Sequence, residues 1–184
     1  MERNEFVYEG WALRQVSEDL KFSKFDCGDT AMNVYFRRKS KKFRRQLLVK
    51  SYHFCPREYT GNEPIMLVDL CNDVIRRDVI PQVSKGKIEK QKLFLETFPA
   101  VKIARLARNK IFAGNQMSVH LFNALKLFFL QNNRTGCRFL TLDAYPQRVP
   151  LYELCGFQKT LADEDISDES ENVSMFFDLI TLNV

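Results

Sequence analysis

Two segments in the last third of the chain hold residues whose types and spacing could support chemistry. The first is the turn between a predicted strand over 101–107 and a predicted helix over 116–131. The first N–H groups of a helix have no intrahelical partner, and the helix dipole places positive potential there. A strand that feeds a helix through a glycine turn can therefore bind an anion, although Asn115 acting only as a helix cap is the alternative. The turn consists of Ala113, Gly114, Asn115, Gln116, Met117 and Ser118.

The second segment is YELCGF, residues 152–157, at the end of a predicted short helix over 149–155. Its tyrosine, Tyr152, carries a phenol whose ordinary pKa is about 10, so it keeps its proton at neutral pH. Such a group can act as a general acid toward a leaving group of similar basicity. The alternative is that Tyr152 only packs in the core.

The cysteines and histidines give no strong further candidate for a metal ligand or a catalytic group. Five scattered cysteines, Cys27, Cys55, Cys71, Cys137 and Cys155, include no CxxC pair, so we expect no metal site. Only two histidines are present, His53 and His120, and a cysteine nucleophile would need one of them as a base. We expect both histidines to be structural.

A basic segment covers residues 37–45, where the sequence RRKSKKFRR has seven basic residues in nine. This density fits contacts with the phosphates of a nucleic acid, and it fits a solvated helix face equally well. The net charge of the chain, +5, suits an anionic partner without identifying it.

Length and composition predict a single folded domain over residues 1–184. Of the 184 residues, 45% are hydrophobic and 12% aromatic, which is enough for a sizeable core. The first residues show no basic-then-apolar leader pattern, and no apolar run reaches the length of about 18 residues that a membrane helix needs. We therefore expect a cytoplasmic protein.

Strands that alternate with helices predict an α/β domain with a mixed sheet. The order begins with a strand over 11–16, a helix over 31–46 capped by Asp29 or Thr30, and a hairpin of strands over 47–54 and 64–73. A polar insertion over 75–97, with a short helix or a loop, comes next. The strand over 101–107, the helix over 116–131, a strand over 138–143, the helix over 149–155 and a closing strand over 173–181 follow. The acidic run over 163–171 reads as a solvated turn.

The segments FPAVKIARLARN, AGNQMSVHLFNALKLFFLQNN, CRFLTLDAY and LYELCGF together resemble the cofactor-binding half of the GNAT superfamily of acyl-CoA-dependent N-acyltransferases. The opening KFDCGDTAMNVYFRRKSKKFRRQLLVKSYHF, with LCND further on, is similar to the branch that contains toxins acetylating aminoacyl-tRNA. The resemblance implies a GNAT-like mixed central sheet flanked by helices on both faces. One difference is that Gln116 and Ser118 stand in a turn where the family usually has small residues, mostly glycine.

The resemblance also implies a site. Acetyl-CoA would be the co-substrate, with its pyrophosphate on the N–H groups of residues 113–118. A backbone N–H near Leu106, Ala107 and Arg108 would polarise the thioester carbonyl, and Tyr152 would protonate the departing thiolate. Three carboxylates, Asp69, Asp73 and Glu96, are unranked candidates for a general base.

The sequence does not identify the acceptor of the acetyl group. It could be an unidentified primary amine or an aminoacyl-tRNA held by the basic segment, and an antitoxin partner would accompany the second case. A third alternative is a GNAT-fold interaction module that no longer binds the cofactor. The sequence is also compatible with a homodimer.

Overall fold

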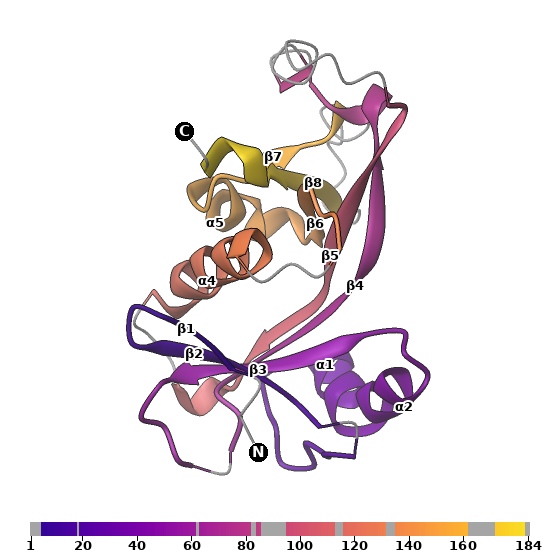
Figure 1. Cartoon of the computed structure of the whole chain (residues 1–184). Helices are drawn as coiled ribbons and strands as arrows, with labels where there is room; N and C mark the ends of the chain where they lie inside the picture. Colours follow the sequence, from indigo (N-terminus) through magenta and orange to yellow (C-terminus); the bar gives the residue numbers. More distant parts are fainter. Residues whose placement is uncertain are drawn as a thin grey trace. The chain divides into compact units, whose positions relative to one another are not determined.

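In the computed structural model, the described residues are 5–17, 19–61, 63–81, 84–85, 95–112, 116–131, 135–161 and 172–182 (Figure 1). Their strands form an eight-stranded sheet in the order β1-β2-β3-β4-β5-β6-β8-β7. The strands are β1 (Glu5–Tyr8), β2 (Trp11–Gln15), β3 (Lys50–Pro56), β4 (Met66–Arg76), β5 (Thr97–Arg108), β6 (Phe139–Ala144), β7 (Gln158–Lys159) and β8 (Val173–Asp178).

The chain divides into two compact units. Unit 1 consists of Met1–Cys71 and Ile103–Phe128, and unit 2 consists of Asn72–Lys102 and Phe129–Val184. Strands β4 and β5 each contribute residues to both units.

In unit 1, β1 to β4 form an antiparallel meander. The hairpin between β1 and β2 turns at Glu9 and Gly10, which have φ angles of 46° and 79°. A two-residue turn with both φ values positive matches the right-handed twist of the strands. The sequence pattern missed β1, so the first strand is not the one predicted over 11–16.

Helices cover both faces of this meander. The predicted helix over 31–46 is confirmed as α1 (Thr30–Val34), a π-helical turn η1 (Tyr35–Lys39) and α2 (Ser40–Arg45). It begins at Asp29, whose Oδ1 accepts the N–H of Met32 at 2.8 Å. The second helix, α4 (Met117–Gln131), lies on the opposite face, where Phe128 contacts Phe6 and Tyr52 with ring centroids 5.5 and 5.7 Å apart.

A buried polar cluster joins the first helix to the sheet. The Tyr35 hydroxyl donates to Asp69 Oδ2 at 2.6 Å, and Asp69 is fully buried. Arg44, only 3% exposed, donates to Ser40 Oγ at 2.8 Å and to the carbonyl of Leu20. Because a buried charge is costly without such partners, these contacts fix the register of the helix on β4.

In unit 2, β5 and β6 are parallel, whereas β6–β8 and β7–β8 are antiparallel. Strand β6 is followed by a 3-10 turn η4 (Pro146–Arg148) and by helix α5 (Val149–Leu154). The chain after β8 forms a 3-10 turn, η6 (Leu179–Leu182), so the closing strand ends at Asp178 and not at 181.

Most of the predicted elements are confirmed with shifts of a few residues at their ends. The strand predicted over 101–107 extends to 97–108, and the sequence pattern missed β7. The insertion predicted over 75–97 contains the end of β4, a 3-10 turn η2 (Arg77–Val79) and a helical turn at residues 84–85. Residues 82–83 and 86–94, like the acidic run at 163–171, lie outside the described residues.

Candidate functional site

The start of α4 forms one part of the candidate site. Gln116 has a φ of 45° and is exposed, Met117 is buried and Ser118 is half-buried. The first intrahelical bonds run from Val119 and His120 to the carbonyl of Gln116. The N–H groups of Met117 and Ser118 precede these bonds, so the helix itself supplies no acceptor for them. Ala113, Gly114 and Asn115 lie outside the described residues.

The chain that leads from β5 to this turn is firmly held. Asn109 is 3% exposed; its N–H donates to the carbonyl of Ile65 at 2.8 Å, and its side chain contacts the carbonyl of Pro64 at 3.3 Å. Phe112 packs edge-on against Tyr59 with centroids 6.0 Å apart. The segment 109–112 is thereby fixed against the loop before β4.

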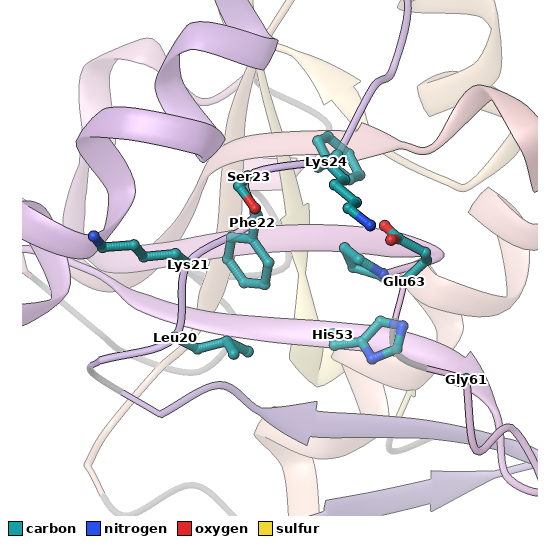
Figure 2. Close-up of a pocket in the computed structure, with 10 residues that line it drawn as sticks. Leu20, Lys21, Phe22, Ser23, Lys24, His53, Gly61 and Glu63 are labelled. Carbon is teal, nitrogen blue, oxygen red and sulfur yellow. The ribbon is translucent and has the colours of Figure 1, made fainter.

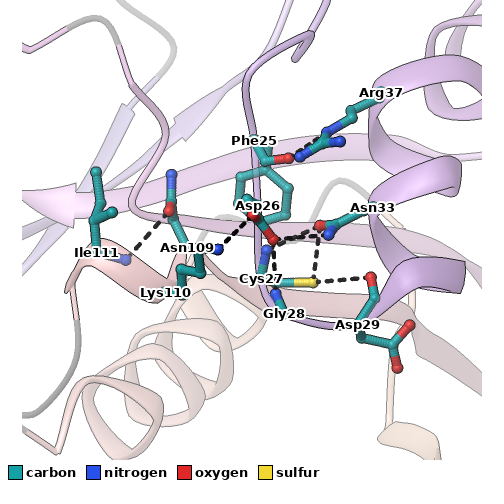
Figure 3. Close-up of polar contacts among 10 residues, drawn as sticks. All are labelled: Phe25, Asp26, Cys27, Gly28, Asp29, Asn33, Arg37, Asn109, Lys110 and Ile111. Atoms are coloured by element: carbon teal, nitrogen blue, oxygen red, sulfur yellow. Dashed lines mark hydrogen bonds and ion pairs between the residues drawn. The ribbon is translucent and has the colours of Figure 1, made fainter.

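A second set of contacts binds the same segment to the loop before α1 (Figure 3). The backbone N–H of Lys110 donates to the carbonyl of Asp26, and the Lys110 ammonium lies 2.7 Å from Asp26 Oδ2. Asp26 Oδ1 also accepts from the N–H of Gly28 and from the amide of Asn33. The Lys110 ammonium and these donors hold the pKa of Asp26 well below its usual range.

Cys27 belongs to the same network and has a structural role. Its N–H and its thiol both contact Asn33 Oδ1, at 2.9 and 3.2 Å. Burial raises the pKa of this thiol, so it stays protonated at neutral pH. The FDCG element therefore acts here as a clasp between the start of α1 and the end of β5.

The residues predicted on β5 lie in unit 1. Ala107 is buried in an apolar cluster with Phe25, Phe36 and Leu67, whereas Leu106 and Arg108 are half-buried. The parallel register of β5 with β6 pairs Ala100, Val101 and Lys102 with Phe139, Leu140 and Thr141. In the described part of the chain this register ends at Lys102, although β5 continues to Arg108 and β6 to Ala144.

Tyr152 lies in unit 2, on α5. The helix ends in a Schellman motif, in which Gly156 N–H donates to Glu153 O at 2.8 Å and Phe157 N–H donates to Tyr152 O at 3.0 Å. Gly156 has a φ of 82°, a conformation that favours glycine. The spacing of YELCGF is thus what this cap requires, and it sets the position of Tyr152. Burial raises the pKa of the Tyr152 phenol, which keeps the phenol protonated.

The three unranked carboxylates have different surroundings. Asp69 is fully buried beneath the first helix, and burial raises its pKa. Glu96 is exposed in the residue before β5. Asp73, on β4, is half-buried, and its Oδ2 accepts the Thr141 hydroxyl at 2.5 Å.

The basic segment 37–45 is only partly available to a partner. Arg44 is buried in the polar cluster, so the sequence prediction that it meets phosphate is wrong. Lys41 and Arg45 form ion pairs with Asp19. The remaining basic side chains of the segment, Arg37, Arg38, Lys39 and Lys42, are exposed, and Arg37 Nε also donates to the carbonyl of Phe25.

A pocket of about 220 Å³ in unit 1 is lined by the loop 20–25, by Gly61, Glu63 and Pro64, and by His53 on β3 (Figure 2). The side chains of Lys24 and Glu63 point toward one another at its edge. His53 forms its wall, and its Nε2 accepts the N–H of Ile65 at 3.0 Å. Burial and the nearby Arg14 lower the pKa of His53 to about 4, so this histidine is neutral at pH 7 and holds the start of β4.

Two features of the site were missed by sequence reasoning. The first is the pairing of Asp26 with Lys110, which joins positions far apart in the chain and has no local signature. The second is the contact of Thr141 with Asp73, which depends on the register of the strands.

Among the described residues, no helix is long and apolar enough to cross a membrane, and no group of histidine, cysteine and carboxylate side chains could hold a metal ion.

No protein-family model and no curated protein sequence matches the chain. Solved structures do match. AtaT complexed with acetyl-methionyl-tRNAfMet superposes with a TM-score of 0.69 at 21% identity, covering 94% of this chain and 97% of that one. A mutant of KacT gives a TM-score of 0.72 at 17% identity, covering 95% and 98%. AtaTR bound with AcCoA gives a TM-score of 0.65 at 21% identity, covering 96% of this chain and 98% of that one.

The predicted GNAT-like α/β fold is confirmed by these likenesses and by the mixed sheet. The resemblance to the branch with tRNA-acetylating toxins is confirmed at the level of the fold. At these identities the likeness shows the fold alone. It does not show the activity, the co-substrate or the acceptor of this chain.

Asp26→Asn should lower the melting temperature at pH 7, because it removes the charge that pairs with Lys110. The folded-state pKa of Asp26 lies below the value of about 3.9 for an unfolded aspartate. Its carboxylate therefore stabilises the fold above that pH, and the contribution is lost as the pH falls through the folded-state pKa. Thermal melts should show a difference between wild type and variant that is largest at neutral pH and shrinks in acid.

Glu58→Gln, at an exposed carboxylate of the same unit, is the matched control and should show no comparable difference. Equal melting temperatures of Asp26→Asn and wild type at pH 7 would contradict a stabilising clasp.

Proposed function

We propose that this chain is an N-acetyltransferase that transfers the acetyl group of acetyl-CoA to a primary amine. The observation that carries the proposal is the early end of the β5–β6 register at Lys102 and Thr141, while both strands continue. Backbone N–H and C=O groups at a strand edge need partners, and the amides of a pantetheine chain have the matching pattern. A shared fold with AtaTR bound with AcCoA supports the same co-substrate.

The pyrophosphate is assigned to the start of α4. The N–H groups of Met117 and Ser118 and the positive end of the helix dipole favour an anion there, whatever side chains these residues carry. The Gln116 amide adds a donor in place of the glycine that the family usually has. The clasp between Asp26 and Lys110 supports this assignment, because it holds the segment that leads into the turn.

The chemistry follows from three groups. The amine attacks the thioester carbonyl carbon while a backbone N–H near Leu106–Arg108 polarises the carbonyl oxygen. The C–N bond forms, the C–S bond breaks, and the thiolate takes the proton of Tyr152. The nitrogen releases one proton to solvent as the amide forms, and a proton from solvent restores the phenol. The phenol carries its proton when the thiolate leaves, because its ordinary pKa of about 10 lies above neutral pH and burial raises the pKa further.

A carboxylate at position 118 should weaken acetyl-CoA binding. Ser118→Glu places a negative charge at the helix start, where it suits the helix dipole but repels pyrophosphate. Ser118→Gln has the same shape without the charge. Calorimetry should give a dissociation constant for acetyl-CoA that is about tenfold or more higher for Ser118→Glu than for Ser118→Gln.

Acetyl-CoA should also raise the melting temperature of the wild type, since a ligand that binds only the native state stabilises it. No binding by the wild type at millimolar acetyl-CoA would contradict the proposed enzyme and would favour the interaction module.

Tyr152→Phe should lower kcat with little effect on acetyl-CoA affinity. The change removes only the hydroxyl, and general-acid catalysis is typically worth about 100- to 10,000-fold. Tyr145→Phe, at an exposed phenol of the same unit, is the control. Release of the CoA thiol measures both rates, and an unchanged kcat in Tyr152→Phe would return this tyrosine to a packing role.

A second proposal concerns the acceptor, which would be the amino group of an aminoacyl-tRNA. The exposed cations of the basic segment favour it, as does the shared fold with AtaT complexed with acetyl-methionyl-tRNAfMet. An antitoxin would then be a further partner, as the complexes of AtaT with the antitoxin AtaR suggest. Localisation in the cytoplasm would suit such a substrate.

Binding of tRNA should weaken steeply with salt if these side chains meet phosphates. Arg38→Glu combined with Lys42→Glu should lower the slope of log affinity against log salt by about two, because each lost contact removes about one. Lys21→Glu with Lys24→Glu, which also reverses two exposed positive charges but lies outside the segment, is the control. If the slope of log affinity against log salt is equal for the two double variants and the wild type, the basic segment is only a solvated helix face.

A further inference from the structure

One wall of the pocket in unit 1 is held in place by the core of the same unit. Arg44 donates to the carbonyl of Leu20, and its guanidinium lies 5.3 Å from the centre of the Phe22 ring. Phe22 and Phe25 are both buried, and both line the pocket. A preformed wall lowers the cost of ordering on binding, so the pocket can hold a ligand without rearranging this loop.

Two opposite charges lie at the edge of this pocket. The side chains of Lys24 and Glu63 come from two different loops and point toward one another (Figure 2). Lys21 also lines the pocket, but its side chain points away from Glu63. A ligand that carries a carboxylate close to an ammonium can meet both charges at once, and charge-assisted hydrogen bonds of this kind are the strong ones.

The size and lining of the pocket suit a small ligand with an apolar body. Its volume is about 220 Å³, whereas an engineered cavity of roughly 150 Å³ is enough to take up benzene. Leu20, Phe22 and Pro64 supply apolar lining. His53 is neutral at pH 7 and its Nε2 accepts the N–H of Ile65, so its one ring proton is on Nδ1. This N–H adds a donor to the wall.

The opposite wall is shared with the segment between β5 and α4. Pro64 lines the pocket, while its carbonyl accepts the side-chain amide of Asn109 at 3.3 Å. Gly61 lines it too, and a Cβ at this position would lie 2.3 Å from the hydroxyl of Tyr59, whose ring packs against Phe112. A ligand that rests on Gly61 and Pro64 therefore restrains that segment as well.

We propose that this pocket binds a free amino acid with an apolar side chain, in its zwitterionic form. Lys24 binds the carboxylate and Glu63 binds the ammonium, while the apolar side chain packs within the pocket. The amino group stays protonated against Glu63, so the amino acid is a ligand and not the acceptor amine. The inference goes beyond the proposed acetyltransferase activity and does not depend on it, because the amino acid binds without acetyl-CoA.

Amide NMR spectra of the wild type, titrated with L-leucine in the absence of acetyl-CoA, test the site. Saturable shifts are expected at the amides of Ser23, Gly61 and Glu63, with those of β6 in unit 2 unchanged. N-acetyl-L-leucine lacks the ammonium and L-leucinamide lacks the carboxylate. Each of these two probes should therefore bind about fivefold or more weakly than leucine.

The variant Lys24→Gln removes the cation proposed to bind the carboxylate. It should weaken leucine binding about fivefold or more and leave leucinamide binding unchanged, because leucinamide has no carboxylate. Lys21→Gln is the matched control, since this lysine belongs to the same loop and its side chain points away from Glu63. This control should bind leucine as the wild type does.

Amide hydrogen exchange tests the link to the segment between β5 and α4. The N–H groups of Lys110 and Phe112 donate to the carbonyls of Asp26 and Asn109. Saturating leucine should slow the exchange of both amides, because a bound ligand stabilises the closed form of the structure around it.

Each measurement has a result that would overturn its part of the proposal. No saturable shift at millimolar leucine would remove the site. Equal affinities for leucine, its N-acetyl derivative and its amide would rule out recognition of the zwitterion, as would equal affinities of Lys24→Gln and Lys21→Gln for leucine. Leucine binding without slower exchange at Lys110 and Phe112 would rule out the link to the segment. Acetyl-CoA binding is measured separately, so none of these results bears on the proposed function.

Discussion

The proposed cofactor site depends on the short register of the parallel pair β5 and β6. Three residue pairs, ending at Lys102 and Thr141, join strands of which β5 continues to Arg108. Neighbouring parallel strands normally satisfy each other's backbone N–H and C=O groups, but here the pairing ends at Lys102 and Thr141. The proposed function uses the edge beyond Lys102 for the pantetheine chain, in the way that a peptide adds to an exposed sheet edge.

Side chains gain their proposed roles from their position relative to this register. Thr141 donates a hydrogen bond to Asp73 at the last paired position. The preceding residue, Leu140, pairs with Phe177, whose ring contacts Phe157, and Phe157 contacts Tyr152. The buried cluster of Tyr35, Asp69 and Arg44 in unit 1 has a structural role, because its hydrogen bonds join the first helix to β4 and to the loop at Leu20.

Much of the fold could be predicted from the sequence, because the elements have strong local signals. The cap at Asp29, the apolar stripe of α4 and the YELCGF cap all depend on residues within one or two turns of each other. The short strands β1 and β7 were missed because a few residues at a sheet edge carry little periodicity. The role of Arg44 was also misjudged, since a cation that pairs with Ser40 and Leu20 in the core looks like its solvated neighbours in the sequence.

Acetyl-CoA is proposed to bind along the edge of β5 and at the start of α4. Amide hydrogen exchange with and without acetyl-CoA tests this binding mode most directly, because each backbone N–H reports its own protection. We expect slower exchange within residues 103–108 and at Met117 and Ser118 when acetyl-CoA is present. Exchange that is unchanged at these amides under saturating acetyl-CoA would contradict it.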